Sequence, residues 1–291
     1  MEKNRRLSSP PEEYVFAVHD GVELKGDLYR PSGKGPFPAL ILVYGGGWSK
    51  GQKERWRDWA AYLARLGITS FATSYRLSKP GRPTYPQSVW DVKSSIQFVK
   101  SKAIEFDIDA KRLGGMGTSA GAHLLSLMTL AGDDPVFQSP YTEETWHGYS
   151  AKLDVAIVTC GIYDMISQWE HDQLTRPLDH ITERYMGGTP MSIREKFYQA
   201  SPLYHASSQN AAGTKWLIAW GTADNVVDYK TQALPFLTAL TRASALVRSV
   251  ELVGAEHFWT MEPLDSDVHC RTFIERLPQF FTNCGWGLDT L

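Results

Sequence analysis

Residues 112–124 read RLGGMGTSAGAHL and place Ser119 in the pattern Gly117-Thr118-Ser119-Ala120-Gly121. A pattern of this GxSxG type marks a nucleophile elbow, in which a strand turns sharply into a helix and leaves the serine at the apex. The serine adopts a strained backbone conformation there, and the residues two positions away must be nearly free of side chain so that strand and helix can approach. Glycines occupy both positions, so the stretch predicts a strand, a tight turn and a helix, with Ser119 as a nucleophile. The alternative for so short a pattern is a glycine turn with a helix-capping serine.

Segments with the character of strands alternate with segments of helical periodicity along most of the chain. Residues 38–44 (PALILVY) form a continuous apolar run, as is typical of a strand that is covered on both faces. The alternation predicts an α/β fold with a mostly parallel central sheet, right-handed crossovers and helices on both faces. Further strands are expected at 68–75, 111–116, 153–159, 215–220 and 246–252, and helices at 53–66, 92–103, 122–130, 230–241 and 267–281.

The start of the chain differs from the rest. Residues 1–12 are polar and contain a Ser-Ser-Pro-Pro cluster, which predicts a loose tail before a single domain at 13–291. Residues 14–18 and 22–29 alternate apolar and polar side chains around Asp20-Gly21, a pattern that predicts an antiparallel hairpin.

The regular alternation breaks between about 161 and 213. This stretch is rich in aromatic, polar, charged and proline residues, and only residues 192–199 suggest a helix. A long irregular segment inside a compact domain is often functional, so we expect a small cap-like insertion over the site.

Composition excludes several classes of partner. The chain has 291 residues, of which 43% are hydrophobic, and its net charge of -2 comes from interspersed charges of both signs. We therefore expect no nucleic-acid partner and no membrane association. The longest apolar run, 38–44, is too short to span a bilayer, and the first thirty residues lack the pattern of a signal peptide.

Cysteine usage points to a reducing compartment. Cys160, Cys270 and Cys284 cannot all pair with one another, and they lack metal-ligand spacing. We expect a cytoplasmic protein with free thiols and with no metal or cofactor. A bridge between Cys270 and Cys284 is the alternative.

Two loops late in the chain supply the acid and the histidine that a serine nucleophile needs. Asp224 follows the predicted strand 215–220, and His257 follows the predicted strand 246–252. Both lie just past the carboxyl ends of strands, where open α/β sheets place their sites, and the order Ser, Asp, His is the one this fold uses. Asp228 is a rival acid.

The other histidines fit the role less well. His123 lies one helical turn behind Ser119, and we expect it to pack within its helix. The remaining six lie in predicted loops, in the insertion or in the last helical region: His19, His147, His171, His180, His205 and His269.

Three consecutive glycines follow the predicted strand 38–44. When a serine attacks a carbonyl group, negative charge develops on the oxygen, and the loss of one preorganised N–H donor costs about 10²–10³ in rate. Glycines present such donors without side chains in the way. We expect the amides of Gly46, Gly47 and Ala120 to form this oxyanion hole, with Gly45 able to replace either glycine. An ordinary glycine turn is the alternative.

Five motifs together resemble a known family. They are YGGGW at 44–48, SYRL at 74–77, GTSAG at 117–121, GTAD at 221–224 and GAEHF at 254–258. The set is similar to α/β-hydrolases of the carboxylesterase type with an HGGGW oxyanion loop, which include hormone-sensitive-lipase-like esterases, feruloyl- and acetyl-esterase-like enzymes and arylformamidases. The resemblance covers roughly residues 20–282 and implies the α/β-hydrolase fold. Two residues depart from the pattern: Tyr44 replaces the usual histidine, which supports the loop in the family, and Glu256 replaces a common glycine.

These observations lead to a functional expectation. We expect a cofactor-independent serine hydrolase that cleaves a small-molecule carboxylic ester through an acyl-enzyme. An amidase of the arylformamidase kind would use the same residues, and a non-catalytic receptor on this fold is a third reading. A homodimer is one option for the assembly.

The substrate pocket is expected to be aromatic. Its candidate residues are Tyr44, Trp48, Tyr163, Trp169 and Phe258, with Trp220 and Trp259 nearby in the motifs. The alternative is that most of these side chains pack in the core, as large aromatics usually do.

Overall fold

The computed structural model describes residues 10–288, and within them eight strands form one sheet in the order β1-β2-β4-β3-β5-β6-β7-β8. The strands β1 and β2 pair antiparallel, β2 pairs antiparallel with β4, and all later pairings are parallel. The predicted hairpin and the mostly parallel sheet are therefore confirmed. The strands are β1 (Glu12–His19), β2 (Val22–Tyr29), β3 (Phe37–Val43), β4 (Thr69–Thr73), β5 (Ile108–Thr118), β6 (Val155–Thr159), β7 (Lys215–Gly221) and β8 (Leu246–Leu252).

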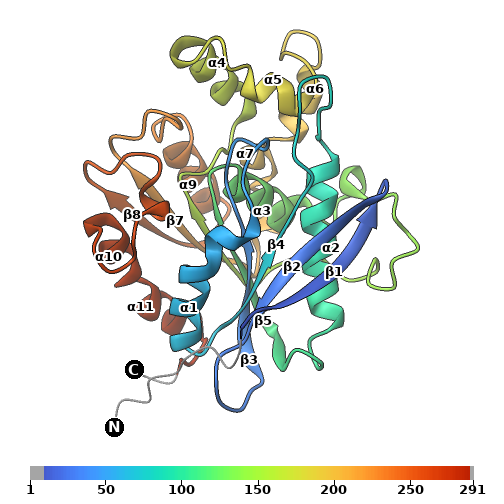
Figure 1. The fold of residues 1–291 in the computed structure, drawn as a ribbon. Coiled ribbons are helices and arrows are strands. Elements are labelled where there is room, and N and C mark those ends of the chain that lie inside the picture. Colours follow the sequence, from blue (N-terminus) through green and yellow to red (C-terminus); the bar gives the residue numbers. More distant parts are fainter. Residues whose placement is uncertain (1–9, 289–291) are drawn as a thin grey trace.

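Helices cover both faces of the sheet (Figure 1). The helices α1, α10 and α11 lie on one side, and α2, α3 and α9 lie on the other. Every residue of β3 is buried, as expected for a strand between two helical layers. The framework helices are α1 (Arg57–Arg65), α2 (Gln87–Ser101), α3 (Ala120–Ala131), α9 (Ala233–Arg242), α10 (Val268–Ile274) and α11 (Leu277–Asn283), and the 3-10 turns are η1 (Lys53–Trp56), η2 (Pro135–Phe137) and η3 (Trp259–Met261).

Several boundaries differ from the sequence prediction. The helix expected at 92–103 begins five residues earlier, at Gln87. The helix expected at 267–281 is divided into α10 and α11, because Pro278 fits the first turn of a helix but not its interior. The predicted tail at 1–12 lies largely outside the described residues, and β1 already begins at Glu12.

The segment between β6 and β7 holds five short helices where one was expected. They are α4 (Met165–Thr175), α5 (Ile181–Met186), α6 (Arg194–Gln199), α7 (Pro202–His205) and α8 (Ser208–Ala211). Figure 1 shows α4, α5 and α6 together at one end of the molecule. We call residues 161–213 the β6–β7 insertion.

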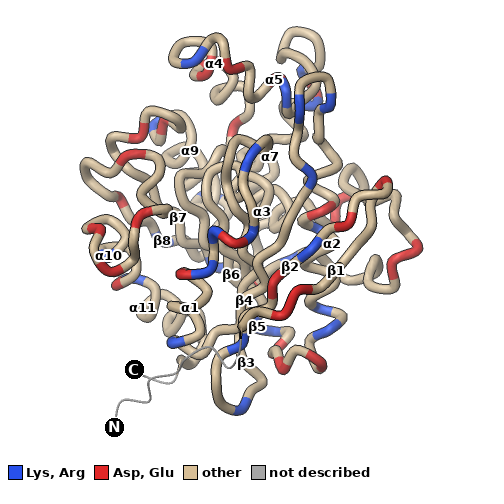
Figure 2. The backbone as a smooth tube through the Cα atoms, in the orientation of Figure 1, with Lys and Arg blue, Asp and Glu red and all other residues tan. Residues whose placement is uncertain are grey.

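Positions of Lys and Arg and positions of Asp and Glu are interspersed along the backbone (Figure 2). No helix within residues 10–288 is long and apolar enough to cross a membrane.

Candidate active site

Ser119 stands at the junction of β5 and α3 with a backbone φ of 54°. A residue other than glycine rarely adopts this left-handed conformation, and the surrounding structure must hold it there. A Cβ atom on Gly117 would lie 2.7 Å from the Gly121 oxygen, and one on Gly121 would lie 2.1 Å from the Val43 oxygen. The two glycines are therefore needed where strand, helix and neighbouring strand meet.

The structure brings Ser119, His257 and Asp224 into one hydrogen-bonded row. His257 Nε2 lies 2.9 Å from Ser119 Oγ, and His257 Nδ1 lies 2.7 Å from Asp224 Oδ2. The other carboxylate oxygen of Asp224 accepts from the amides of Val226 and Val227, both at 2.9 Å. Each oxygen of the carboxylate thus has donors, which fixes its orientation toward the imidazole.

The rival acid and the other histidines lie elsewhere. Asp228 Oδ1 accepts from the amide of Lys230 and so stabilises the turn before α9. His123 is fully buried in α3, as expected. His19 lies among carboxylates at the end of β1, far along the chain from the elbow.

Cys160 lies behind this row at the end of β6. Its Sγ accepts a hydrogen bond from Trp259 Nε1 at 3.1 Å. Among the described residues, Cys160, Asp224 and His257 are the one group whose ligand atoms come close enough to share a cation, all within 4.8 Å. Burial raises the pKa of the Cys160 thiol, and a metal requires the thiolate, so the environment disfavours such a site.

The glycine loop lies against the elbow. A Cβ atom on Gly45 would lie 2.9 Å from Ser119 Cβ, and one on Gly46 would lie 2.2 Å from the Lys50 oxygen. Across residues 10–288, the amides of Gly46 and Gly47 donate to no protein acceptor. Ala120 is the first residue of α3, and a helix leaves its first amides without intrahelical acceptors. Three N–H groups are thus free for a ligand beside Ser119.

Tyr44 anchors the start of this loop. Its ring stacks on Tyr75 at a centroid distance of 4.5 Å, and Tyr75 Oη donates to the Tyr44 carbonyl at 2.9 Å. Burial raises the pKa of Tyr44 to about 12, so the side chain stays neutral. Tyr75 belongs to the SYRL motif, so this motif supports the glycine loop, a role that the sequence alone does not reveal.

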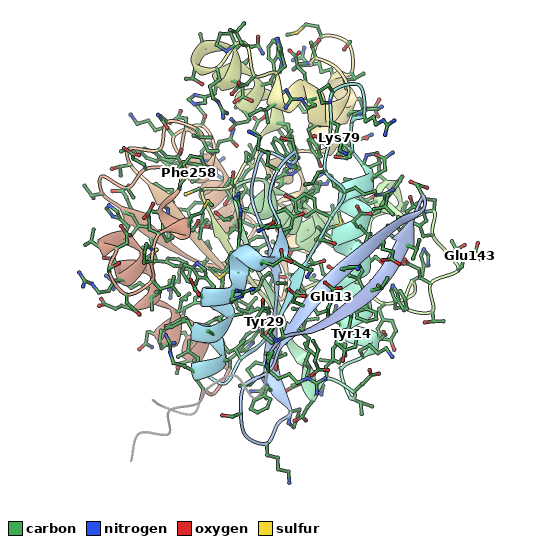
Figure 3. The ribbon with its side chains drawn as sticks, viewed as in Figure 1. Glu13, Tyr14, Tyr29, Lys79, Glu143 and Phe258 are labelled. Atoms are coloured by element: carbon green, nitrogen blue, oxygen red, sulfur yellow. The ribbon has the colours of Figure 1, made fainter. Side chains whose placement is uncertain are left out.

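A cavity of about 520 Å³ opens beside Ser119 and the glycine loop. Of the expected pocket residues, Tyr44, Trp48 and Phe258 line it. Phe258 is 58% exposed and is labelled in Figure 3. The cavity is otherwise lined by apolar, polar and charged side chains, including Trp56, Trp59, Ile162, Gln168, Asp172, Arg176, Asp179, Ile181, Val226, Val227, Thr260, Met261 and Glu262.

Two expected pocket residues lie outside this lining. Tyr163 is fully buried, and its ring stacks on Phe236 at 4.1 Å, so it belongs to the core. Trp169 directs Nε1 to Glu183 Oε1 at 2.8 Å within the insertion. Trp220 and Trp259 are also buried. The alternative that aromatics pack in the core therefore holds for Tyr163, Trp220 and Trp259, whereas Trp169 is partly buried and packs against the core from the insertion.

The contributions of η1, α1 and the insertion to the cavity wall were not predicted from the sequence. Trp56 and Trp59 lie at three-residue spacing, which predicts only one face of an amphipathic helix. Ile181 begins α5, and Arg176 directly follows the last residue of α4; neither helix was predicted. Spacing within one helix identifies a buried face, but it does not distinguish core from cavity wall.

Comparison with known proteins places the chain in a family. The BD-FAE family model matches residues 26–238. The chain belongs to the BD-FAE family. Among its relatives is the probable carboxylic ester hydrolase LipM of Mycobacterium tuberculosis, 30% identical over 234 residues, which cover 80% of this chain and 51% of LipM. The esterase LipC of the same organism is 30% identical over 229 residues, covering 76% of this chain and 53% of LipC.

This BD-FAE chain spans about half the length of these curated relatives. A solved structure covers it almost entirely: Est2, a thermophilic esterase from Thermogutta terrifontis solved with butyrate bound, is 25% identical with a TM-score of 0.79. The match covers 97% of this chain and 96% of Est2. The α/β-hydrolase fold implied by the motifs is confirmed.

Proposed function

We propose that this BD-FAE protein is a serine hydrolase that cleaves a carboxylic ester of a small molecule through an acyl-enzyme. The observation that carries the proposal is the row from Ser119 Oγ through His257 to Asp224, with distances of 2.9 and 2.7 Å, at the wall of a cavity. LipM and LipC are named as a probable carboxylic ester hydrolase and an esterase, which supports ester cleavage.

Each residue has a defined role in the proposed reaction. Ser119 Oγ attacks the ester carbonyl carbon while His257 Nε2 takes the hydroxyl proton. Asp224 holds the proton on Nδ1 and stabilises the imidazolium that forms. His257 then gives its proton to the leaving alcohol. A water molecule, deprotonated by the same imidazole, releases the acid from Ser119.

The developing oxyanion is stabilised by backbone donors. We assign the amides of Gly46, Gly47 and Ala120 to this role, with Gly45 as the alternative glycine. These donors are held in place before the reaction, so they stabilise the transition state without a reorganisation cost. No cofactor takes part in any step of the proposed mechanism.

Replacement of the nucleophile tests the proposal. We expect Ser119→Ala to abolish turnover of a short p-nitrophenyl ester and labelling by a fluorophosphonate, because both reactions need Oγ. Ser126→Ala is a matched control: Ser126 is buried on the same helix, and its hydroxyl has no partner among the described residues. Labelling that persists in Ser119→Ala would overturn the assignment.

The amidase and the receptor are outcomes of a second assay. Turnover of N-formyl-kynurenine in preference to phenyl acetate would indicate the amidase, since an arylformamidase uses the same residues on a small amide. Tight binding of a small molecule with no turnover of either substrate would indicate the receptor.

We further propose a cytoplasmic location with no nucleic-acid partner. The three cysteines are free thiols, which suits a reducing compartment, and charges of both signs are interspersed in Figure 2. Cell fractionation tests the location, and light scattering distinguishes a monomer from a homodimer.

A further inference from the structure

Trp48 directly follows the three glycines and is held by contacts to three other parts of the chain. Its φ is 53°, a strained conformation that persists only where the surroundings enforce it. The indole Nε1 donates to His123 Nδ1 at 3.0 Å, and the ring stacks on Tyr185 of α5 at 4.5 Å and 9°. The amide of Ser78 donates to the Trp48 carbonyl at 2.8 Å. The glycine loop therefore ends at Trp48, a residue whose position these contacts fix.

His123 connects Trp48 to Ser119. Its own amide donates to the Ser119 carbonyl at 3.0 Å, so the two residues belong to the same first turn of α3. Its Nε2 lies 2.7 Å from the Ala200 carbonyl in the β6–β7 insertion. An indole N–H can only donate and a carbonyl can only accept, so Nδ1 accepts and Nε2 carries the proton.

The imidazole keeps this single form. His123 is fully buried, and burial lowers its pKa to about 4 even though the Ala200 carbonyl favours protonation. A proton on Nδ1 would face the indole N–H and break the bond to Trp48. The neutral ring therefore joins the glycine loop, the nucleophile helix and the insertion with two directed hydrogen bonds.

We infer that Trp48 and His123 are positioning residues, which hold the amides of Gly46 and Gly47 at the distance from Ser119 that oxyanion binding requires. Oxyanion donors act only within about 2.7–3.1 Å of the oxygen, so a small loop displacement removes them. The inference rests on the proposed function. It also accounts for Tyr44 in place of the family's histidine, because Tyr75 holds one end of the loop and His123 holds the other.

Three substitutions test the pair. Trp48→Phe keeps a ring against Tyr185 but removes the donor, and His123→Leu removes both hydrogen bonds. We expect each to lower kcat by about tenfold to a hundredfold with KM changed less than about threefold, the signature of an interaction made in the transition state. His123→Gln retains an acceptor and a donor, so it should recover most of the loss.

Trp216→Phe is the matched control. Trp216 is fully buried on β7, outside the cavity lining, and its Nε1 has no partner among the described residues. It loses the same atoms as Trp48→Phe without losing a hydrogen bond, so kcat should stay within about twofold of wild type.

Two further readouts separate positioning from a general loss of structure. The affinity for a trifluoromethyl ketone, which forms an oxyanion on Ser119, should fall in proportion to kcat/KM, while the affinity for an unreactive amide analogue should not change. The double variant Trp48→Phe/His123→Leu should be no slower than the worse single variant, because both substitutions break the same hydrogen bond between Trp48 and His123. Multiplied losses, an unchanged kcat or unchanged ketone affinity would overturn the inference.

The nitrogen NMR signals of His123 test the bond without turnover. We expect an Nε2–H tautomer whose Nδ1 shift moves in Trp48→Phe and not in Trp216→Phe. If the Nδ1 shift of His123 does not change in Trp48→Phe, the positioning role of these two residues is overturned. If the wild type shows this signal but no ester turnover, the proposed function is overturned instead.

Discussion

Gly121 illustrates how a single hydrogen atom in place of a methyl group permits the elbow. A Cβ atom here would lie 2.1 Å from the Val43 oxygen and 2.5 Å from the Tyr44 oxygen, and both are backbone atoms that cannot rotate away. We expect Gly121→Ala to lower the free energy of unfolding by about 3 kcal/mol or more and to abolish turnover, since α3 must move off β3. Urea unfolding measures the change.

Gly148→Ala is the control for that substitution. Gly148 has open space around its Cα, so the change in the free energy of unfolding should stay within about 0.5 kcal/mol. If both variants unfold at the same urea concentration, the close approach at Gly121 is not what requires glycine.

The cysteines give a second prediction at this scale. Cys160, Cys270 and Cys284 are buried free thiols, and burial raises the pKa of Cys270 to about 12 and that of Cys284 to about 11. Because the thiolate is the reactive form, we expect no reaction with a chromogenic disulfide reagent in the native protein and three titratable thiols after unfolding. A count of one in the unfolded, unreduced protein would instead reveal the Cys270–Cys284 bridge.

The sequence predicts the positions of the three triad residues better than those of the aromatic pocket candidates. Ser119, Asp224 and His257 lie in short motifs whose order along the chain fixes which strand ends they follow, and the structure brings them within hydrogen-bonding distance. Tyr163 and Trp169 had only their aromatic character and their position in the insertion as guides. Whether an aromatic ring lies in a core or at a cavity wall depends on the packing of distant elements, which no local pattern encodes.

Among the elements, the β6–β7 insertion was the hardest to predict. Periodicity needs several turns to be recognised, and four of its five helices have six residues or fewer. Their start signals are nevertheless present: Asp164 caps α4, Ser207 caps α8 and Pro202 begins α7. The sheet was easier to predict, because β3 is a continuous apolar run that is followed by glycines.

The 3-10 turn η1 contributes Trp56 to the cavity wall. One buried lysine of this turn, Lys53, binds three carboxylates and so stabilises its position. Lys53 Nζ contacts Asp27 at 2.6 Å, Glu13 at 2.9 Å and Glu54 at 3.1 Å, and only 8% of Lys53 is exposed. We expect Lys53→Met to lower the free energy of unfolding by about 3–5 kcal/mol, because the carboxylate of Asp27 is left buried without its partner. Denaturant unfolding tests this.

Two variants show whether the buried charge is the cause. Lys53→Met/Asp27→Leu removes both partners and should recover most of the stability. Lys102→Met breaks an exposed pair with Glu105 and should cost less than about 1 kcal/mol. Equal losses in Lys53→Met and in the double variant would contradict an electrostatic cause.

At the scale of the whole molecule, a buried histidine ties the N-terminal hairpin to the rest of the fold. His19 Nδ1 lies 2.7 Å from Asp91 on α2, and Nε2 lies 2.8 Å from Glu144 in the loop before β6. The ring stacks on Tyr141 at 3.7 Å, and Arg76 of the SYRL motif binds the same Asp91. Since carboxylates face both ring nitrogens, both must donate, and the ring is an imidazolium.

This arrangement makes stability depend on pH with a definite sign. Burial opposes the charged ring, but the hydrogen bonds to Asp91 and Glu144 outweigh it and raise the pKa of His19 above its ordinary 6.5. The folded state therefore binds the proton more tightly than the unfolded chain. The stabilisation is fully present below about pH 6.5 and is lost as the pH rises through the raised pKa.

We expect the free energy of unfolding of the wild type to fall as the pH rises between about pH 7 and pH 8, below the main titration of the cysteine thiols, and this slope to be much smaller in His19→Gln. The remaining groups that face the ring, Asp20, Arg76 and Tyr141, keep their charge state over most of this range, so the slope belongs to the imidazole. Urea unfolding at successive pH values gives the measurement, and His269→Gln, on α10 and outside the network, should keep the slope of the wild type. A slope that survives in His19→Gln would show that another group titrates in this range and that the imidazolium is not the cause.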